Sequence, residues 1–284
     1  MKNYITLLIF LTLVVACSSQ NKVKTNISPI DLQILDSLKN DVFANNMHPK
    51  FLDVASFFIG TPYVGGVLDK SSKEELVINL HELDCVTYIE NVLSIYAIID
   101  TSNFNSKFCK ELKRLRYRNN RVEGYISRLH YYTEWLYRNV EKGILVDKTK
   151  DFGGILYSKH IDFMSKNYTR YKFLSNNPSL VKQIKEKEKY INSLNFYYIP
   201  KENIAKIESQ IEDGDIMLIT TNIPGLDVSH LGLAVWKNSH IHLLNASSRH
   251  KKVEISDKSL IEYLMDNKLQ TGIMIARLKK DISN

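Results

Sequence analysis

The chain has 284 residues, of which 44% are hydrophobic and 24% charged, an ordinary composition for a globular protein. This length can bury a sizeable core, as one large domain or as two small ones. The formal charge of +7 would suit an anionic polymer or a membrane surface, but the basic residues are spread along the chain and no recognisable nucleic-acid-binding motif accompanies them. We therefore expect no nucleic acid among the ligands.

The first residues are typical of an export signal. Lys2 precedes an apolar run over 4–16, which is shorter than the roughly 18 residues of a membrane span. The ending Val14-Val15-Ala16-Cys17 resembles the lipobox of bacterial lipoproteins, whose cysteine is acylated and becomes the first residue of the mature chain. An ordinary signal peptide with a chance cysteine is the alternative.

From this pattern we predict a signal peptide over 1–16 and a flexible, lipid-anchored tether over 17–28. The protein would then be exported and held by lipid on Cys17 at a membrane of the cell envelope. Because no acidic run follows Cys17, we expect the anchor to face the periplasm.

Apolar residues at three- and four-residue steps mark helices in the first part of the chain. They predict a helix over 30–38 with Asp31 as N-cap, a second near 49–59, and a strongly amphipathic one over 85–99. Residues 104–142 look helical or mixed, and 158–212 mostly helical.

Short β-like runs separated by turns follow in the last part of the chain. Helices first and strands afterwards indicate an α+β fold in one domain over 29–284, with a mostly helical insertion at about 100–210. The strands are expected over 215–220, 231–236, 241–246, 252–255 and 273–278, with one helix over 259–267.

Cys85 opens the predicted helix over 85–99. A cysteine there lies beside unpaired backbone N–H groups and the positive end of the helix dipole, which stabilise a thiolate and lower its pKa. A thiolate is the nucleophile of cysteine catalysis. Position alone leaves two alternatives: a buried core cysteine, or a disulfide with Cys109 in an oxidising compartment.

His230 stands at the start of an apolar strand. A base held there could reach a helix N-terminus packed against the sheet, so His230 is a candidate general base. The next strand carries His242 and Asn245, and either could bond the far nitrogen of His230 and hold its tautomer. They are three positions apart in the chain, so they face opposite sides of a strand and at most one can point at the site.

Four more polar residues could belong to a site. Arg128, which could bind a carboxylate bidentately, and His130 could form one wall, or could be surface residues of a helix. Asp227 could line the cleft or only start a strand. For Asp84 the role of helix N-cap is the better interpretation, because an acid beside a thiol would otherwise raise its pKa.

His240 and His242 could face one way on a strand and bind a metal. No glutamate-containing zinc motif accompanies them. We therefore expect no metal and no other cofactor.

Four short motifs follow one another along the chain. They are Gly60-Thr61-Pro62-Tyr63, Leu83-Asp84-Cys85-Val86-Thr87, Ser229-His230-Leu231-Gly232 and Leu244-Asn245-Ala246-Ser247-Ser248. In this order they resemble the motifs of the NlpC-type, papain-like cysteine hydrolases of bacterial cell walls. More narrowly, the chain resembles the N-acetylmuramoyl-L-alanine amidase-like family within that superfamily, from about Phe57 to Arg277.

The resemblance implies a papain-like core, in which a helical layer bearing the nucleophile packs on an antiparallel sheet. Cys85 would be the nucleophile, His230 the base, and Asn245 the third residue, at a place where the superfamily often has histidine. Tyr63 would lie beside the nucleophile and help stabilise the oxyanion. The substrates would be small murein fragments, cut at the amide between N-acetylmuramic acid and L-alanine.

Two other functions compete with this amidase. One is a cysteine endopeptidase that cuts within the stem peptide of murein, an activity more widespread in the superfamily. The other is a lipoprotein that binds murein without catalysis on a degenerate scaffold, although the presence of both Cys85 and His230 argues against it.

Overall fold

The structure is a computed structural model that describes residues 27–43, 50–98 and 103–279. The predicted signal peptide, Cys17 and all but the last two residues of the predicted tether lie outside these ranges. None of the helices within them combines the length and the hydropathy that a bilayer crossing needs.

A mixed α+β fold is built on an eight-stranded sheet whose pairings are antiparallel. The strand order is β2-β3-β8-β4-β5-β6-β7, with β1 also paired to β8. The strands are β1 (Leu145–Asp147), β2 (Ile155–Leu156), β3 (Tyr197–Pro200), β4 (Ile216–Thr221), β5 (Val228–Lys237), β6 (His240–Ser247), β7 (Lys252–Ser259) and β8 (Gln270–Leu278).

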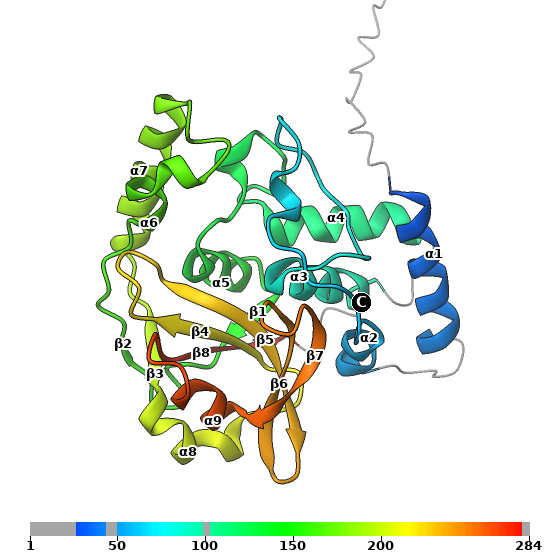
Figure 1. The fold of residues 1–284 in the computed structure, drawn as a ribbon, viewed down its shortest axis with the longest axis vertical. Coiled ribbons are helices and arrows are strands. Elements are labelled where there is room, and N and C mark those ends of the chain that lie inside the picture. Colours follow the sequence, from blue (N-terminus) through cyan, green and yellow to red (C-terminus); the bar gives the residue numbers. More distant parts are fainter. Residues whose placement is uncertain (1–26, 44–49, 99–102, 280–284) are drawn as a thin grey trace, which may run out of the picture.

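The helices cover both faces of this sheet, as Figure 1 shows. They are α1 (Pro29–Leu38), α2 (Phe51–Phe57), α3 (Cys85–Tyr96), α4 (Phe104–Arg116), α5 (Tyr132–Glu141), α6 (Phe163–Lys166), α7 (Pro178–Asn192), α8 (Ile204–Ile207) and α9 (Leu260–Met265), with short 3₁₀ and π turns among them. The larger core joins α1 to α5 to one face, and a smaller one joins α8 and α9 to the other.

Helix α3 lies at the centre of the larger core, packed against β5 and β6 on one side and against α2 and α4 on others. Residues 87–95 of this helix are all buried. A helix enclosed on this scale cannot shift without opening cavities, which cost free energy. Its first residue is therefore held in a defined place relative to the sheet.

Within the described residues, the three helices predicted in the first part of the chain and the five strands and one helix predicted in the last part are confirmed. One detail is wrong, the N-cap of the first helix. Ser28, not Asp31, is the N-cap of α1, because Pro29 occupies the first helical turn and the Ser28 hydroxyl accepts from the Asp31 N–H at 3.2 Å. Asp31 instead reaches across to accept from Leu80 N at 2.8 Å and contacts His81 Nδ1 at 2.9 Å. It thereby ties α1 to the segment leading into α3.

The described part of the segment over 100–210 contains helices α4 to α8, and it also supplies three strands that the sequence did not reveal. β1 and β3 pair with β8, and β2 pairs with β3. These strands have only two to four residues each. Runs this short show no period of two, so alternation could not identify them.

A buried ion pair joins three helices behind α3. Arg116 Nε donates to Glu90 Oε2 at 2.6 Å, and both side chains are only 1% exposed. Trp135 Nε1 of α5 donates to the other Glu90 oxygen at 3.2 Å, and Arg116 also donates to the Val77 carbonyl at 2.7 Å. Both charges are thus paired and hydrogen-bonded, as burial requires.

We predict that Arg116→Met lowers the free energy of unfolding by about 3–5 kcal/mol, because it leaves the Glu90 carboxylate buried without its partner. Denaturant unfolding measures this loss. The matched control is Arg121→Met, whose side chain is 77% exposed, and which should change stability by about 0.5 kcal/mol or less. Equal losses in the two variants would contradict the assigned role of the pair.

Candidate active site

Asp84 fixes the start of helix α3 and hence the position of Cys85. Its carboxylate accepts from the backbone N–H groups of Val86 at 3.1 Å and Thr87 at 2.8 Å, while Thr87 Oγ1 accepts from the Asp84 N–H at 2.9 Å. This reciprocal capping satisfies helix N–H groups that would otherwise lack partners. The predicted N-cap role of Asp84 is confirmed.

Backbone hydrogen bonds join the segment before Cys85 to the segment that carries Tyr63. Leu83 N donates to the Pro62 carbonyl at 2.9 Å, and Val64 N donates to the Leu83 carbonyl at 3.0 Å. Tyr63 N in turn donates to Lys251 O at 2.9 Å, next to β7. Burial, with Cys85 and Asp84 close by, raises the pKa of Tyr63 to about 12, so its hydroxyl keeps its proton and can donate.

Strand β5 carries His230 at the point where it leaves its partner β6. The ladder between them runs from Lys237 opposite His240 to Leu233 opposite Leu244, so the first residues of β5 lie beyond it. The start of α3 packs there, and the Leu231 N–H, next to His230, faces the Cys85 sulfur. The fold therefore brings Cys85 and His230 together from residues 145 positions apart in the chain.

Asn245 is the partner of His230. His230 Nε2 lies 2.9 Å from Asn245 Oδ1, and Asn245 Nδ2 donates to the Leu243 carbonyl at 3.0 Å, which orients the amide. Gly232 allows this approach, since a Cβ at that position would lie 2.6 Å from Leu243 Cδ1 and 3.0 Å from Asn245 Cβ.

His242, the alternative partner considered from the sequence, is directed elsewhere. Its Nδ1 bonds the Ser256 carbonyl at 2.8 Å, and the residue is 6% exposed. Strand alternation had required that at most one of His242 and Asn245 face His230. The structure selects Asn245, and the reserve assignment of His242 is wrong.

The expected lowering of the Cys85 pKa is also wrong in its net direction. The backbone N–H groups of Cys85, Val86 and Leu231 do lower it, but burial of the sulfur and the Asp84 charge outweigh them and raise the pKa of Cys85 to about 12. Burial likewise lowers the pKa of His230 below 6.5, against the opposing effect of its bond to Asn245. The free protein thus holds a neutral thiol beside a neutral imidazole.

A pocket of about 330 Å³ opens beside these residues. It is bounded by Asp84 and Val86 on either side of Cys85 and by Ser229 just before His230. Of the other predicted site residues, Arg128, His130 and Asp227 line it. The remaining lining residues are Gly66, Leu68, Asp69, Tyr125, Leu129, Tyr131, Tyr132, Met164, Tyr171, Leu226 and Val228.

Arg128 and His130 are built into the pocket wall and are already partnered. Arg128 forms ion pairs with Asp69 at 2.5 Å and with Glu74 at 3.5 Å, and it lies over the Tyr125 ring. His130 Nε2 bonds the Tyr125 carbonyl at 2.8 Å, and burial beside Arg128 lowers the pKa of His130 well below its usual value. Arg128 therefore lines the pocket while the carboxylates of Asp69 and Glu74 offset its positive charge.

Asp227 is the cap of helix α5 rather than a free acid. Its Oδ2 accepts from Thr133 N at 2.8 Å and from Thr133 Oγ1 at 2.9 Å, although the two residues are 94 positions apart. This bond fixes Tyr132, the first residue of α5, which lines the pocket. Burial raises the pKa of the Tyr132 hydroxyl well above its usual value, and the charge of a Cys85 thiolate would add to this effect. Sequence reasoning missed Tyr132, which directly follows the Arg128–Tyr131 stretch.

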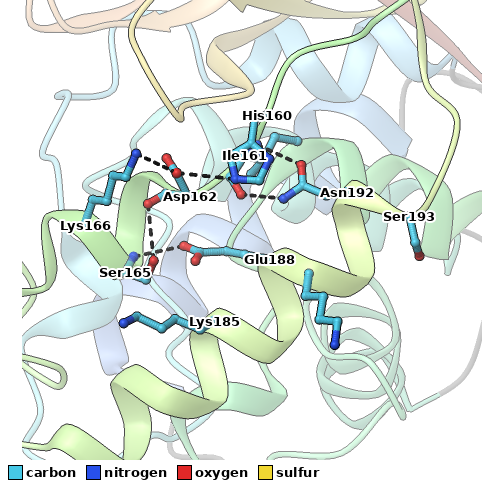
Figure 2. A pocket seen from close by; sticks show the side chains of 10 residues that line it. His160, Ile161, Asp162, Ser165, Lys166, Lys185, Glu188, Asn192 and Ser193 are labelled. Atoms are coloured by element: carbon cyan, nitrogen blue, oxygen red, sulfur yellow. Dashed lines mark hydrogen bonds and ion pairs between the residues drawn. The ribbon is translucent and has the colours of Figure 1, made fainter.

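A larger cavity of about 660 Å³ between α6 and α7 shows how the insertion supports this wall (Figure 2). Glu188 of α7 turns inward, where its Oε1 accepts from Ser165 N at 2.9 Å and from the Tyr131 hydroxyl at 2.7 Å. Asp162 pairs with Lys166 at 2.8 Å. These contacts hold Tyr131 and, through Met164, the far side of the pocket.

The other residues weighed from the sequence lie outside the pocket. Cys109 is a buried free cysteine on α4, and Cys85 is free as well. His240 contacts Glu208 at 3.3 Å, while His242 bonds Ser256. In the described ranges, no group of three or more His, Cys, Asp or Glu side chains could hold a metal ion.

We predict that Cys85 is a protonated thiol at neutral pH. Since its pKa is raised to about 12, thiolate should form only as the pH rises towards that value. The ultraviolet absorbance of thiolate, measured as the difference between wild type and Cys85→Ser, should therefore be absent at neutral pH and grow in alkali. Cys109 is present in both proteins and cancels. A full thiolate signal at neutral pH would contradict the assignment.

Comparison with known proteins adds a family and a fold. The model of a family described as N-acetylmuramoyl-L-alanine amidase-like matches residues 53–273. That range contains Cys85, His230 and Asn245. A comparison with the curated proteins gives no significant match.

Several solved structures are similar to the chain. An N-acetylmuramoyl-L-alanine amidase from Bacteroides uniformis is 38% identical, with 81% of this chain and 99% of that one covered and a TM-score of 0.76. A Bacteroides fragilis protein assigned provisionally as a xylanase is 36% identical over 80% of this chain and 100% of that one, with a TM-score of 0.74. A Legionella pneumophila protein at 24% identity, covering 89% and 97% with a TM-score of 0.63, shares the fold.

Proposed function

The chain belongs to the N-acetylmuramoyl-L-alanine amidase-like family, and from that premise we propose that it is a cysteine amidase acting on muropeptides. The bond cut is the amide between N-acetylmuramic acid and L-alanine. Membership already implies a cell-wall hydrolase with murein-derived substrates. The observation that supports a cysteine mechanism is the arrangement of three residues: Cys85 at the start of α3, His230 on β5 and Asn245 on β6.

The hydrogen bond to Asn245 sets the tautomer of His230. If Nε2 carries the proton and donates to Asn245 Oδ1, Nδ1 is left with a lone pair. The low pKa of His230 keeps that nitrogen unprotonated at neutral pH. The imidazole can then take the thiol proton as the sulfur attacks, without a standing charge on either group.

The reaction proceeds through a thioester. Cys85 Sγ bonds to the lactyl carbonyl carbon while its proton passes to His230, and the carbonyl oxygen becomes an oxyanion. The Cys85 backbone N–H at the start of α3 and the Tyr63 hydroxyl stabilise that charge. His230 gives its proton to the alanine nitrogen as the C–N bond breaks, and water activated by His230 then hydrolyses the thioester.

The proposal extends to the fold superfamily, the domain bounds and the location of the protein. A nucleophile on a helix packed against an antiparallel sheet that bears the base supports an NlpC-type, papain-like core. The domain would span 29–284, after a signal peptide and a lipid anchor on Cys17 that faces the periplasm. An exported, tethered enzyme would meet murein fragments at the membrane where they are made or released.

The name of the Bacteroides fragilis neighbour raises glycoside hydrolysis as an alternative. Glycosidases of the usual kind need two free carboxyl groups flanking the bond, about 5–9.5 Å apart. In the pocket beside Cys85, Asp84 caps α3, Asp227 caps α5, and Asp69 is paired with Arg128. Carboxylates that already accept hydrogen bonds or pair with an arginine are not available as the acid and base of a glycosidase. The site therefore favours amide hydrolysis over glycoside hydrolysis.

Digestion of defined muropeptides followed by mass spectrometry tests the proposal. Wild type should release intact stem peptide and a sugar product, and Cys85→Ala should lose activity by at least about 10⁴-fold because the nucleophile is gone. Cys109→Ala is the matched control and should stay active. Cleavage within the stem peptide would establish an endopeptidase instead, and a folded but inactive wild type would leave only a binding role.

We predict that Asn245→Ala lowers kcat by about 10–100-fold, because His230 loses the group that orients it. The control is His242→Gln, which lies on the same strand and should keep kcat close to that of wild type. Steady-state kinetics on the muropeptide measure both. An Asn245→Ala enzyme as fast as wild type would remove Asn245 from the proposed triad.

A further inference from the structure

Asp31 is a buried acid on α1 that the proposed mechanism does not use. Its side chain is 1% exposed, although α1 stands at one edge of the helical layer (Figure 1). Three groups surround the carboxylate: the Ser28 hydroxyl at 2.6 Å, the Leu80 N–H at 2.8 Å and His81 Nδ1 at 2.9 Å. Because an ionised carboxylate can only accept, all three donate to it, as burial of the charge requires.

Two of these donors belong to the segment over 79–84, which leads directly into Cys85. This segment forms no helix and none of the named strands, so no regular ladder holds it in place. Side chains do so instead. Asn91 Nδ2 of α3 donates to the Asn79 carbonyl at 2.9 Å, and Asp31 of α1 binds the next two residues. The approach to the nucleophile is therefore held from two helices.

The same segment supports both groups that the mechanism assigns to the oxyanion. The Cys85 N–H follows it directly. Leu83 forms a parallel bridge with Tyr63, through two backbone hydrogen bonds. A displacement at Leu80 would therefore be passed to the Cys85 N–H on one side and to the Tyr63 segment on the other.

Helix α1 precedes residues 53–273, the range that the family model matches. The nucleophile, its base and the segment over 79–84 all lie inside that range. The acceptor that holds this segment thus comes from a part of the chain that carries none of the four motifs. Its contribution to the site is visible only in the folded structure.

We propose that Asp31 is a positioning residue for the amidase reaction. It holds the segment over 79–84 so that the Cys85 sulfur, the Cys85 N–H and the Tyr63 hydroxyl meet the scissile carbonyl together. The inference rests on the proposed function, because it takes Cys85 as the nucleophile. Since Asp31 acts through the backbone and not by contact with substrate, its loss should slow the chemical step and leave substrate binding unchanged.

Steady-state kinetics on the muropeptide test this role. Asp31→Ala should lower kcat by about tenfold with KM unchanged, because small misplacements of reacting groups are costly. Asp31→Asn should keep kcat near that of wild type. Its Oδ1 can still accept from Leu80 and His81, and its amide can donate to the Ser28 hydroxyl. This rescue separates geometry from charge.

The matched control is Asp36→Ala on the same helix, whose side chain is 72% exposed and pairs with Lys39 at 3.0 Å. It should keep the kcat of wild type. Circular dichroism at the assay temperature gives the folded fraction of each variant. A kcat loss in Asp31→Ala that only matches its unfolded fraction would overturn the inference, as would an Asp31→Asn enzyme as slow as Asp31→Ala.

His81→Ala keeps the test decisive if Asp31→Ala does not fold. It removes one of the three donors, from a side chain that is 34% exposed, and leaves the Leu80 N–H on Asp31. It should lower kcat by about threefold, again with KM unchanged. A His81→Ala enzyme with the kcat of wild type would then overturn the inference.

Hydrogen exchange followed by mass spectrometry separates this inference from the proposed function. Asp31→Ala should speed the exchange of amide hydrogens over 79–86 by about tenfold or more, because the Leu80 N–H loses its acceptor, and leave α7 unchanged. If wild type cleaves no muropeptide, the proposed function fails, and this measurement decides the positioning by itself. Faster exchange over 79–86 would support it, and exchange equal to that of wild type would overturn it.

Discussion

The packing of the start of α3 against the start of β5 is the contact on which the rest of the structure depends. It places the Cys85 sulfur beside the Leu231 N–H and next to His230, at the point where β5 leaves its ladder with β6. If β5 and β6 stayed paired up to the start of β5, their backbone N–H and C=O groups would bond each other, and no space would remain between the two strands. The divergence of two strands thus makes room for a helix end, and this helix end carries Cys85, the proposed nucleophile.

Polar contacts over long sequence separations hold the elements around that point. Glu90 and Arg116 lock α3 to α4, with Trp135 of α5 added, and Asp227 caps α5 from the loop before β5. Glu188 extends the same support into the insertion through Tyr131. Each of these contacts is buried, so removing one partner would leave the other desolvated, and this cost favours the observed geometry of the wall.

Burial also sets the resting state of the site. It raises the pKa of Cys85 and lowers that of His230, so the two groups are neutral together, although helix N–H groups favour the thiolate. A neutral pair inside a half-enclosed site avoids the desolvation of two charges until substrate arrives. Among the N–H groups that favour the thiolate, that of Val86 is used by the Asp84 cap, whereas that of Cys85 lies outside the cap and would donate to the oxyanion of the proposed reaction.

Much of the outline could be predicted from the sequence, because it rests on local pattern. Apolar spacing revealed α3, the last five strands and α9, and Asp84 marked the helix start that presents Cys85. What stayed hidden depends on contacts between distant residues: the three short strands of the insertion, the true partners of Asp31 and the place of Tyr132. The choice between Asn245 and His242 belongs here too, since alternation says only that they face opposite ways. The sequence by itself determined which side chains could do the chemistry, and tertiary structure decided which of them meet and with what pKa, because burial and strand divergence exist only once the chain is packed.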